Sequence, residues 1–163
     1  MVIVRKEKFN SEKSIQYISD KAEKTENKSG MEDLKLGAAI DIGTTSIAVG
    51  LFDMENEVLL GNLTQTNCQT KFGSDVMMRI MHCTNGKEQL LHDMLIEQIE
   101  NIITVIIEQN ISEKYKSYVV ERMTVVGNTT MCHIFLNRDV TGLSGAPFSM
   151  AYKGIANVNS QEA

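Results

Sequence analysis

One short run of residues combines an acid, a glycine and two hydroxyls: Asp41-Ile42-Gly43-Thr44-Thr45. Gly43 permits backbone angles that a side chain resists, and it removes bulk where a phosphate must approach the main chain. The amides of such a turn, helped by the Thr44 and Thr45 hydroxyls, can donate hydrogen bonds to phosphate oxygens. Asp41 suits Mg²⁺, held through water because Mg²⁺ keeps much of its hydration shell. The same residues also suit an ordinary hairpin, so the run alone leaves both interpretations open.

A second polar group follows an apolar run later in the chain and contains Asn128, Thr129 and Thr130. These side chains can orient water or phosphate, but a threonine in this position can equally cap a helix. An asparagine cannot abstract a proton, so phosphoryl transfer to a substrate hydroxyl is disfavoured. We therefore take Asn128 and Thr129 as candidate ligand-binding residues and assign no catalytic residue.

The remaining chemistry-bearing side chains lack the spacing of a metal site. The histidines are scattered, and the cysteines are odd in number and form no CxxC pair: His82, His92, His133, Cys68, Cys83 and Cys132. This pattern argues against a disulfide framework and against a four-cysteine cluster. We expect free thiols and core or surface roles for the histidines.

The composition is that of a soluble globular protein, with 163 residues, 42% hydrophobic and 23% charged. A net charge of −5 argues against non-specific nucleic-acid binding, which needs a basic face. The N-terminal residues lack the apolar stretch of a secretory signal, and no run of about 18 apolar residues indicates a membrane span. We expect a cytoplasmic protein with neither nucleic acid nor membrane as a partner.

The acid and the two threonines must be positioned by strands on either side of them. Residues 37–42, 46–52 and 57–66 each read as a strand, with the candidate turn joining the first two. Links this short allow only antiparallel pairing, because a parallel crossover needs a dozen residues or more. The sequence therefore predicts a three-stranded antiparallel meander.

Helices and one more strand follow. Ser74 is a candidate N-cap for a helix over residues 75–81. The next helix is the strongest element, because apolar residues recur at three- and four-residue steps: Leu91, Leu95, Ile99, Ile102 and Ile106, widened by Leu90, Met94, Ile103 and Ile107. A strand over residues 118–126 precedes a short helix over residues 131–136, which Thr129 or Thr130 can cap.

The element order predicts an α/β fold of the ribonuclease-H-like kind, with three antiparallel strands and then helix, strand and helix. The fifth strand and third helix usual in that fold are not predicted, so we expect an incomplete lobe. Residues 1–35 read as a charged extension or linker, with a short helix beginning at Ser11. Residues 36–150 form the lobe, and residues 151–163 read as a frayed tail.

Several segments together resemble a known family. Residues 39–46 look like the first phosphate motif of the actin-like ATPase superfamily, which includes acetate and sugar kinases and the heat-shock chaperones. Residues 71–80 resemble the "FGADVISRI" segment of the reductive activators of corrinoid-dependent proteins. Residues 125–133 and 145–148 resemble their "VVGNTTMLH" and "APF" segments. The resemblance covers residues 36–150, with the segments in the same order.

The resemblance implies ATP-dependent reactivation of a corrinoid protein, with ATP and Mg²⁺ as cofactors. In that family, ATP binding and hydrolysis accompany reduction of an inactive Co(II) corrinoid to Co(I). The electron comes through a [2Fe-2S] cluster in a separate N-terminal ferredoxin-like domain. Residues 1–35 contain no cysteine, so we expect no iron-sulfur cluster in this chain.

The sequence departs from the family by ending before the second phosphate motif and the adenosine-binding motif. Only half of the nucleotide clamp is therefore expected, with ATPase-type activity requiring a second lobe and little hydrolysis by the chain alone. An open sheet edge would invite that lobe or self-association. Two alternatives stay open: a non-catalytic interaction fragment that keeps the fold, and a fragment of a sugar- or acetate-kinase-like phosphotransferase.

Overall fold

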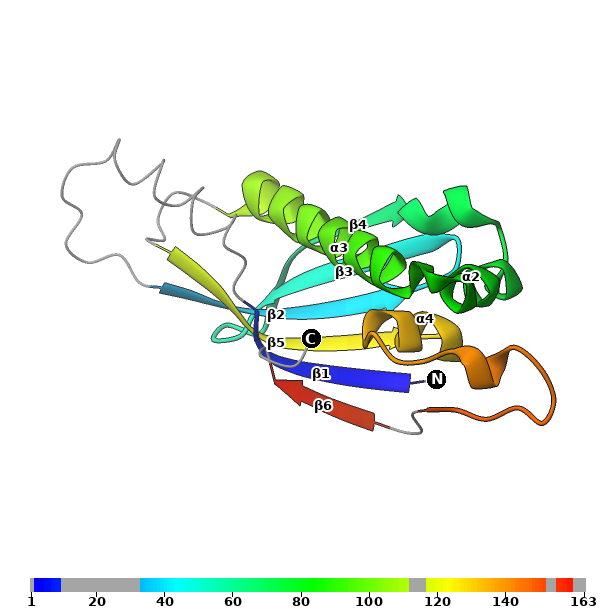
Figure 1. Cartoon of the computed structure of the whole chain (residues 1–163). Coiled ribbons are helices and arrows are strands. Elements are labelled where there is room, and N and C mark those ends of the chain that lie inside the picture. Colours follow the sequence, from blue (N-terminus) through cyan, green and yellow to red (C-terminus); the bar gives the residue numbers. More distant parts are fainter. Residues whose placement is uncertain (1, 10–32, 112–116, 152–154, 160–163) are drawn as a thin grey trace.

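The structure, a computed structural model, is an α/β fold in which one twisted sheet carries helices (Figure 1). It describes four stretches of the chain, namely residues 2–9, 33–111, 117–151 and 155–159. The short helix expected from Ser11 lies outside these described residues.

Three antiparallel strands form the predicted meander: β2 (Asp33–Ile42), β3 (Ser46–Asp53) and β4 (Val58–Thr66). β3 pairs antiparallel with β2 on one side and with β4 on the other. In β3 every second residue is buried, because successive side chains in a strand point to opposite faces of the sheet. The predicted meander is confirmed, and β2 begins four residues before the predicted residue 37.

A helical segment follows β4. It consists of a 3₁₀ turn, η1 (Cys68–Phe72), then α2 (Val76–His82), a kinked turn η2 (Cys83–Lys87) and the long helix α3 (Glu88–Asn110). Gly86 at the kink has φ +80°, a conformation that glycine adopts without steric cost. Because of this kink, α3 runs along the sheet in a different direction from α2 (Figure 1).

The apolar stripe of α3 faces the sheet as predicted. The five residues that define it are each at most 1% exposed: Leu91, Leu95, Ile99, Ile102 and Ile106. Leu90 differs from the prediction, because its side chain is 47% exposed. Neighbouring residues on a helix point about 100° apart, so Leu90 cannot face the sheet in the same direction as Leu91.

The predicted caps of both shorter helices are wrong by one or two residues. α2 is capped by Asp75 rather than Ser74, because the Asp75 carboxylate accepts a hydrogen bond from the Met78 amide at 2.9 Å. After β5 (Ser117–Gly127), the helix α4 (Thr129–Phe135) begins earlier than predicted.

The cap of α4 is Asn128, whose side-chain oxygen accepts from the Met131 amide at 3.0 Å. Thr129 and Thr130 are therefore helical residues rather than caps. A short 3₁₀ turn, η3 (Thr141–Leu143), follows α4.

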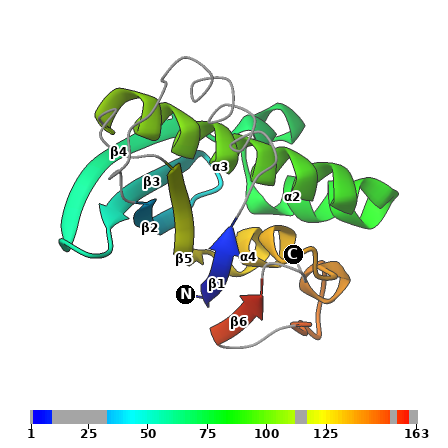
Figure 2. The same ribbon diagram turned by 90° about the vertical axis from the view of Figure 1, so that its left-hand side faces the viewer.

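Two further strands extend the sheet beyond β5. β1 (Val2–Phe9) pairs antiparallel with β5, and β6 (Ile155–Asn159) pairs parallel with β1. The strand order is β4-β3-β2-β5-β1-β6 (Figure 2). Neither strand was predicted: they come from the segments read as a charged extension and a frayed tail. Half of the residues of β1 are charged, and its partner is distant along the chain. β1 thus covers one edge of β5, and within the described residues the outer strands of the sheet are β4 and β6.

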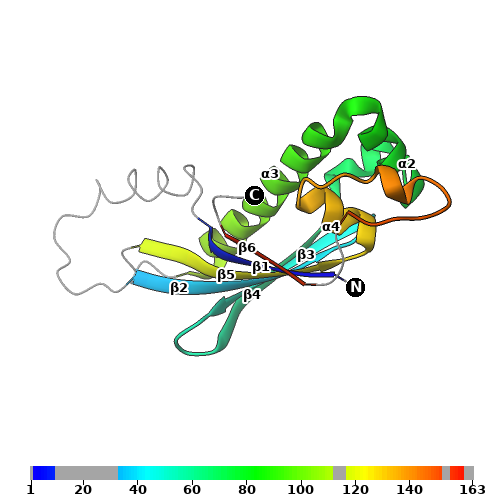
Figure 3. The ribbon, with the colours of Figure 1, turned by 60° about the horizontal axis from the view of Figure 1, so that its bottom comes forward.

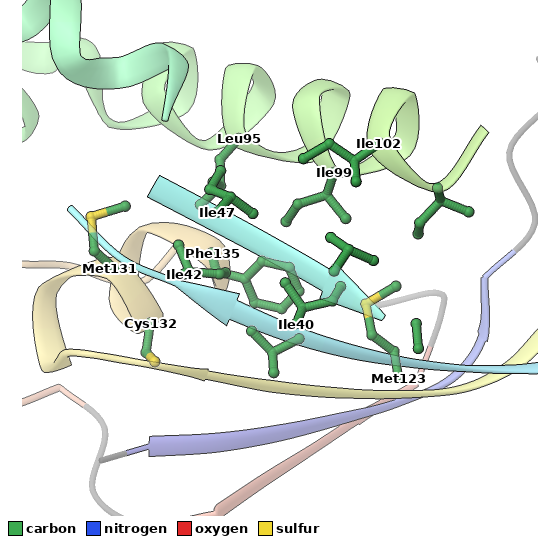
Figure 4. Packing of buried hydrophobic residues seen from close by; sticks show 14 of the residues in the cluster. Ile40, Ile42, Ile47, Leu95, Ile99, Ile102, Met123, Met131, Cys132 and Phe135 are labelled. Carbon is green, nitrogen blue, oxygen red and sulfur yellow. The ribbon is translucent and has the colours of Figure 1, made fainter. Parts of the chain in front are cut away.

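The core lies between the sheet and α2, α3 and α4, which all cover the same face of the sheet (Figure 3). Leu95 and Ile99 from α3 and Phe135 from α4 pack against Ile40 and Ile42 of β2 (Figure 4). β5 runs parallel to β2, so the carboxyl ends of these two strands lie side by side. This arrangement is the predicted ribonuclease-H-like plan. No helix in the described part of the chain has the length and apolar character that a bilayer-spanning helix requires.

Candidate functional site

The turn between β2 and β3 is closed by a hydrogen bond from the Gly43 amide to the Ser46 carbonyl at 2.8 Å. A Cβ atom at Gly43 would lie 2.8 Å from that same oxygen, so no other residue fits without moving the turn. The backbone angle φ of Gly43 is not among the positive ones. The predicted need for unusual backbone angles at Gly43 is therefore wrong. The lack of a side chain is required here by the Ser46 carbonyl of the turn itself, and the predicted approach of a phosphate stays a prediction.

The end of β5 lies against this turn. Ile42 pairs with Gly127, and a Cβ atom at Gly127 would lie 2.8 Å from the Ile42 carbonyl oxygen. The residue that follows, Asn128, donates from its side-chain nitrogen to the Thr44 hydroxyl at 3.0 Å. The structure thus brings together two groups of candidate residues that lie 84 positions apart in the sequence.

Asn128 links two elements at once. Its oxygen accepts from the Met131 amide and caps α4, and its nitrogen donates to the Thr44 hydroxyl, so one side chain contacts both the helix and the turn. Thr129 is half-buried, and its carbonyl accepts from Nδ1 of His133 at 2.8 Å. The amide nitrogen of Asn128 is exposed and lies beside the turn, which leaves this edge accessible to a ligand.

Asp41 lies on the opposite side of β2 from the core. Its neighbours Ile40 and Ile42 are buried under the helices, so alternation directs the exposed Asp41 to the face without helices. Among the described residues, no three His, Cys, Asp or Glu side chains come together to hold a metal ion. A single carboxylate suits Mg²⁺ bound mostly through water, not a cage of protein ligands.

Asn67, which directly follows β4, supports the turn from beneath and was missed at the sequence level. It is fully buried. Its side-chain nitrogen donates to the Gly43 carbonyl at 2.9 Å, and its main-chain amide donates to the Thr45 carbonyl at 2.8 Å. Its side-chain oxygen accepts from the Gln69 amide at 2.9 Å, which fixes the orientation of the Asn67 side chain.

Arg79 of α2 is the second supporting residue that the sequence did not reveal. Its guanidinium is buried and donates to the carbonyls of Gly73 and Thr44, the latter at 3.4 Å. Burial lowers the pKa of Arg79, and the Asp75 carboxylate acts in the opposite direction. Arg79 lies within residues 71–80, the segment that resembles corrinoid activators, but that resemblance gave it no role.

The carbonyls of Gly43, Thr44 and Thr45 therefore all accept hydrogen bonds from the side of Asn67 and Arg79. Within the described part of the chain, the amides of Thr44 and Thr45 have no hydrogen-bond partner. Consecutive amides without internal partners are the feature that lets a turn receive an anion. The arrangement can bind a phosphate group next to Asp41.

The histidines and cysteines lie apart from this turn or serve packing. Nδ1 of His92 contacts the Ile134 carbonyl at 3.0 Å, and the ring of His82 packs edge-on against Phe72. The side chains of Cys83 and Cys132 are buried in the core. Burial, reinforced by Glu88, raises the pKa of Cys83 to about 11. These contacts agree with the predicted core and surface roles.

Comparison with known proteins places the chain near the following proteins. Residues 36–163 match the family model described as the RACo middle region. Over 114 residues the chain is 34% identical to the corrinoid activation enzyme RamQ of Eubacterium limosum, covering 69% of this chain and 19% of that protein. A solved structure, a reductive activator for corrinoid, iron-sulfur protein, matches with a TM-score of 0.63 and 30% identity, covering 78% of this chain and 20% of its own. The chain thus spans about a fifth of the length of these two relatives.

Proposed function

The chain belongs to the RACo middle-region family, and from that premise we propose that it provides the phosphate-binding lobe of a reductive activator of a corrinoid protein. The two matched relatives are named for corrinoid activation and for reductive activation of a corrinoid, iron-sulfur protein. Their names support a corrinoid protein as the partner of this chain. In the complete activator, ATP binding and hydrolysis would accompany the transfer of one electron to Co(II), giving Co(I), with the electron delivered through the [2Fe-2S] cluster of a separate ferredoxin-like domain, as the family resemblance implies.

The observation that carries the proposal is the β2–β3 turn. Its three carbonyls are held by buried donors, and the amides of Thr44 and Thr45 are left to donate to phosphate oxygens. Gly43 allows the turn to close, because a Cβ atom there would lie 2.8 Å from the Ser46 carbonyl oxygen. Asn128 fixes Thr44 from the neighbouring strand end, and Thr129 follows it at the start of α4. These residues fit the phosphate groups of ATP.

Mg²⁺ would be held by Asp41 through water, which agrees with one exposed carboxylate beside the turn. The bound ion would offset the negative charge of the phosphates. The groups of this chain bind and orient phosphate. A second lobe would have to supply the adenosine contacts and the remainder of the hydrolytic machinery.

Thermal unfolding with three ligands tests the proposal. Mg-ATP and Mg-tripolyphosphate should both raise the melting temperature, whereas adenosine should not, because the turn recognises phosphate. At about 100 times Kd, binding adds about 2.7 kcal/mol, which is about 5–10 °C for a domain of this size.

Two variants link the shift to the turn. Asp41→Ala should lose most of the rise in melting temperature that Mg-ATP causes. The matched control Asp93→Ala, on the exposed side of α3, should keep this rise. If Mg-ATP does not move the melting temperature of the parent, the chain is a non-catalytic interaction module instead.

A kinase-like phosphotransferase is the less favoured function. Asn128 occupies the strand end where an acid would be needed as a base, and its oxygen is already engaged by the Met131 amide. A phosphorylated small-molecule product would support this alternative over the activator.

A further inference from the structure

A buried arginine lies directly beneath the β2–β3 turn. The side chain of Arg79 is 0% exposed, although it comes from a short helix at the surface of the fold. One guanidinium nitrogen donates to the Gly73 carbonyl, and the other terminal nitrogen donates to the Thr44 carbonyl at 3.4 Å. The guanidinium therefore joins α2 to the turn through the main chain rather than through another side chain.

No carboxylate among the described residues forms a salt bridge with this buried cation, and its Nε atom has no hydrogen-bond partner there. The Asp75 carboxylate attracts the charge of Arg79 without forming a salt bridge with it, and burial still lowers the pKa of Arg79. Removing a charged or polar group from water without a direct partner is unfavourable. An anion bound on the other side of the turn would add negative charge near this cation.

The geometry of the peptide bond connects Arg79 to the ligand side. In a planar trans peptide, the C=O and the following N–H point in opposite directions. A donor on the Thr44 carbonyl therefore directs the Thr45 amide away from Arg79, and Asn67 on the Gly43 carbonyl does the same for the Thr44 amide. Two successive amides are thus turned toward the accessible side.

We propose that Arg79 is a positioning residue of the phosphate site: its buried guanidinium holds the Thr44 carbonyl so that the Thr45 amide faces a phosphate oxygen of the nucleotide. The proposal rests on the proposed function, since it names a supporting residue of the same site. Arg79 itself does not touch the phosphate. It acts through one peptide unit.

Two substitutions of Arg79 test this role against the control Arg138→Met, which removes an exposed arginine after α4. Arg79→Met removes the charge and both donors, whereas Arg79→Lys keeps the charge but replaces the planar fork of two terminal nitrogens with a single ammonium nitrogen. For each protein, the Kd of Mg-ATP is measured by calorimetry. The chemical shift and hydrogen exchange of the Thr45 amide are measured without nucleotide.

Arg79→Met should bind Mg-ATP about ten to a hundred times more weakly, the range for a hydrogen bond to a charged group. The Kd of Arg79→Lys for Mg-ATP should lie between the values for Arg79→Met and the parent, and the Kd of Arg138→Met should equal that of the parent. In both Arg79 variants the chemical shift of the Thr45 amide should change, and its hydrogen exchange with solvent should be faster. This readout would not move if Arg79 served packing alone.

The proposal is overturned if Arg79→Met folds, binds Mg-ATP with the Kd of the parent, and shows the same chemical shift and hydrogen exchange of the Thr45 amide as the parent. If Arg79→Met does not fold, Arg79→Lys decides, and an unchanged Thr45 amide in that variant also overturns it. If the parent itself does not bind Mg-ATP, the proposed function fails. The Thr45 amide measured without nucleotide still tests the role of Arg79.

Discussion

Cys83 illustrates how burial of one side chain makes the stability of the protein depend on pH. Its thiol is 5% exposed at the start of the turn between α2 and α3, and burial raises its pKa from 9.0 to about 11. The unfolded chain loses the proton near pH 9, but the folded chain keeps it to about pH 11. Stability from this group is therefore complete below pH 9 and is lost as the pH rises from 9 to 11.

Replacing Cys83 with alanine should remove this loss. We expect the free energy of unfolding of the parent to fall by about 2 kcal/mol more than that of Cys83→Ala between pH 8 and pH 11. Urea unfolding at a series of pH values measures the difference. Thr84→Ala, which changes the next residue but no ionisable group, should behave like the parent. The prediction would be contradicted if the free energy of unfolding fell equally with pH in the parent and in Cys83→Ala.

At the scale of residues, the sequence revealed those parts of the site that lie together in the chain. Gly43, Thr44 and Thr45 could be picked out because an acid, a glycine and two hydroxyls adjoin. Asn67 and Arg79 could not, because their partners in the turn lie 24 and 35 positions away, and a buried arginine has the same sequence signature as an exposed one.

At the scale of elements, α3 carries the packing that keeps the strand ends in place. Its buried face packs against β3, β4 and η1, which follow the β2–β3 turn, and against α4, which follows β5. The helix therefore contacts elements next to both strand ends of the site. Ile99 lies at the centre of that face (Figure 4) and is 1% exposed. Truncation of this residue leaves a cavity that a close-packed core cannot fully close.

Ile99→Ala should reduce the free energy of unfolding by about 2–5 kcal/mol, the range for removing a large aliphatic side chain from a core. The control Asn101→Ala changes an exposed residue of the same helix and should stay within about 0.5 kcal/mol of the parent. Chemical unfolding followed by circular dichroism measures both. Similar losses in the two variants would mean that α3 does not bury the predicted face.

The elements that the sequence predicted well are those specified by local periodicity. The stripe of α3 and the alternation in β3 repeat several times, so the signal is strong. The helix caps shifted by one or two residues because several neighbouring polar side chains can accept the same hydrogen bond, and only the backbone geometry selects one. β1 was missed because nothing in its charged sequence identifies β5 as its partner.

At the scale of the whole molecule, β5 is the strand that joins the two parts of the sheet. β2 pairs with it in parallel on one side, and β1 pairs antiparallel on the other. The family match begins at residue 36, so β1 lies outside the matched residues. β6 then pairs with β1, and within the described residues it depends on β1 for its place in the sheet.

Replacing Val2–Phe9 by a glycine-serine segment of equal length should release one side of β5. We expect the β5 amides that bond to β1 to exchange faster with solvent, and the β5 amides that bond to β2 to keep their protection. β3 serves as the internal control because both of its neighbours are retained. Residue-resolved hydrogen exchange measures this pattern. Uniform exchange throughout the sheet, or no change in β5, would contradict the strand order.

During synthesis on the ribosome, β1 cannot pair with β5 until some time after β1 itself has been made. Val2 pairs with Gly127, so β1 leaves the exit tunnel long before its partner has been made. At about 5–20 residues per second, β5 follows roughly 6–25 s later. During that interval an apolar strand would be exposed to other chains, and charged residues are a common means of discouraging such contacts. The run Arg5-Lys6-Glu7-Lys8, which hid β1 from the sequence-based prediction, would keep the nascent strand soluble until β5 emerges.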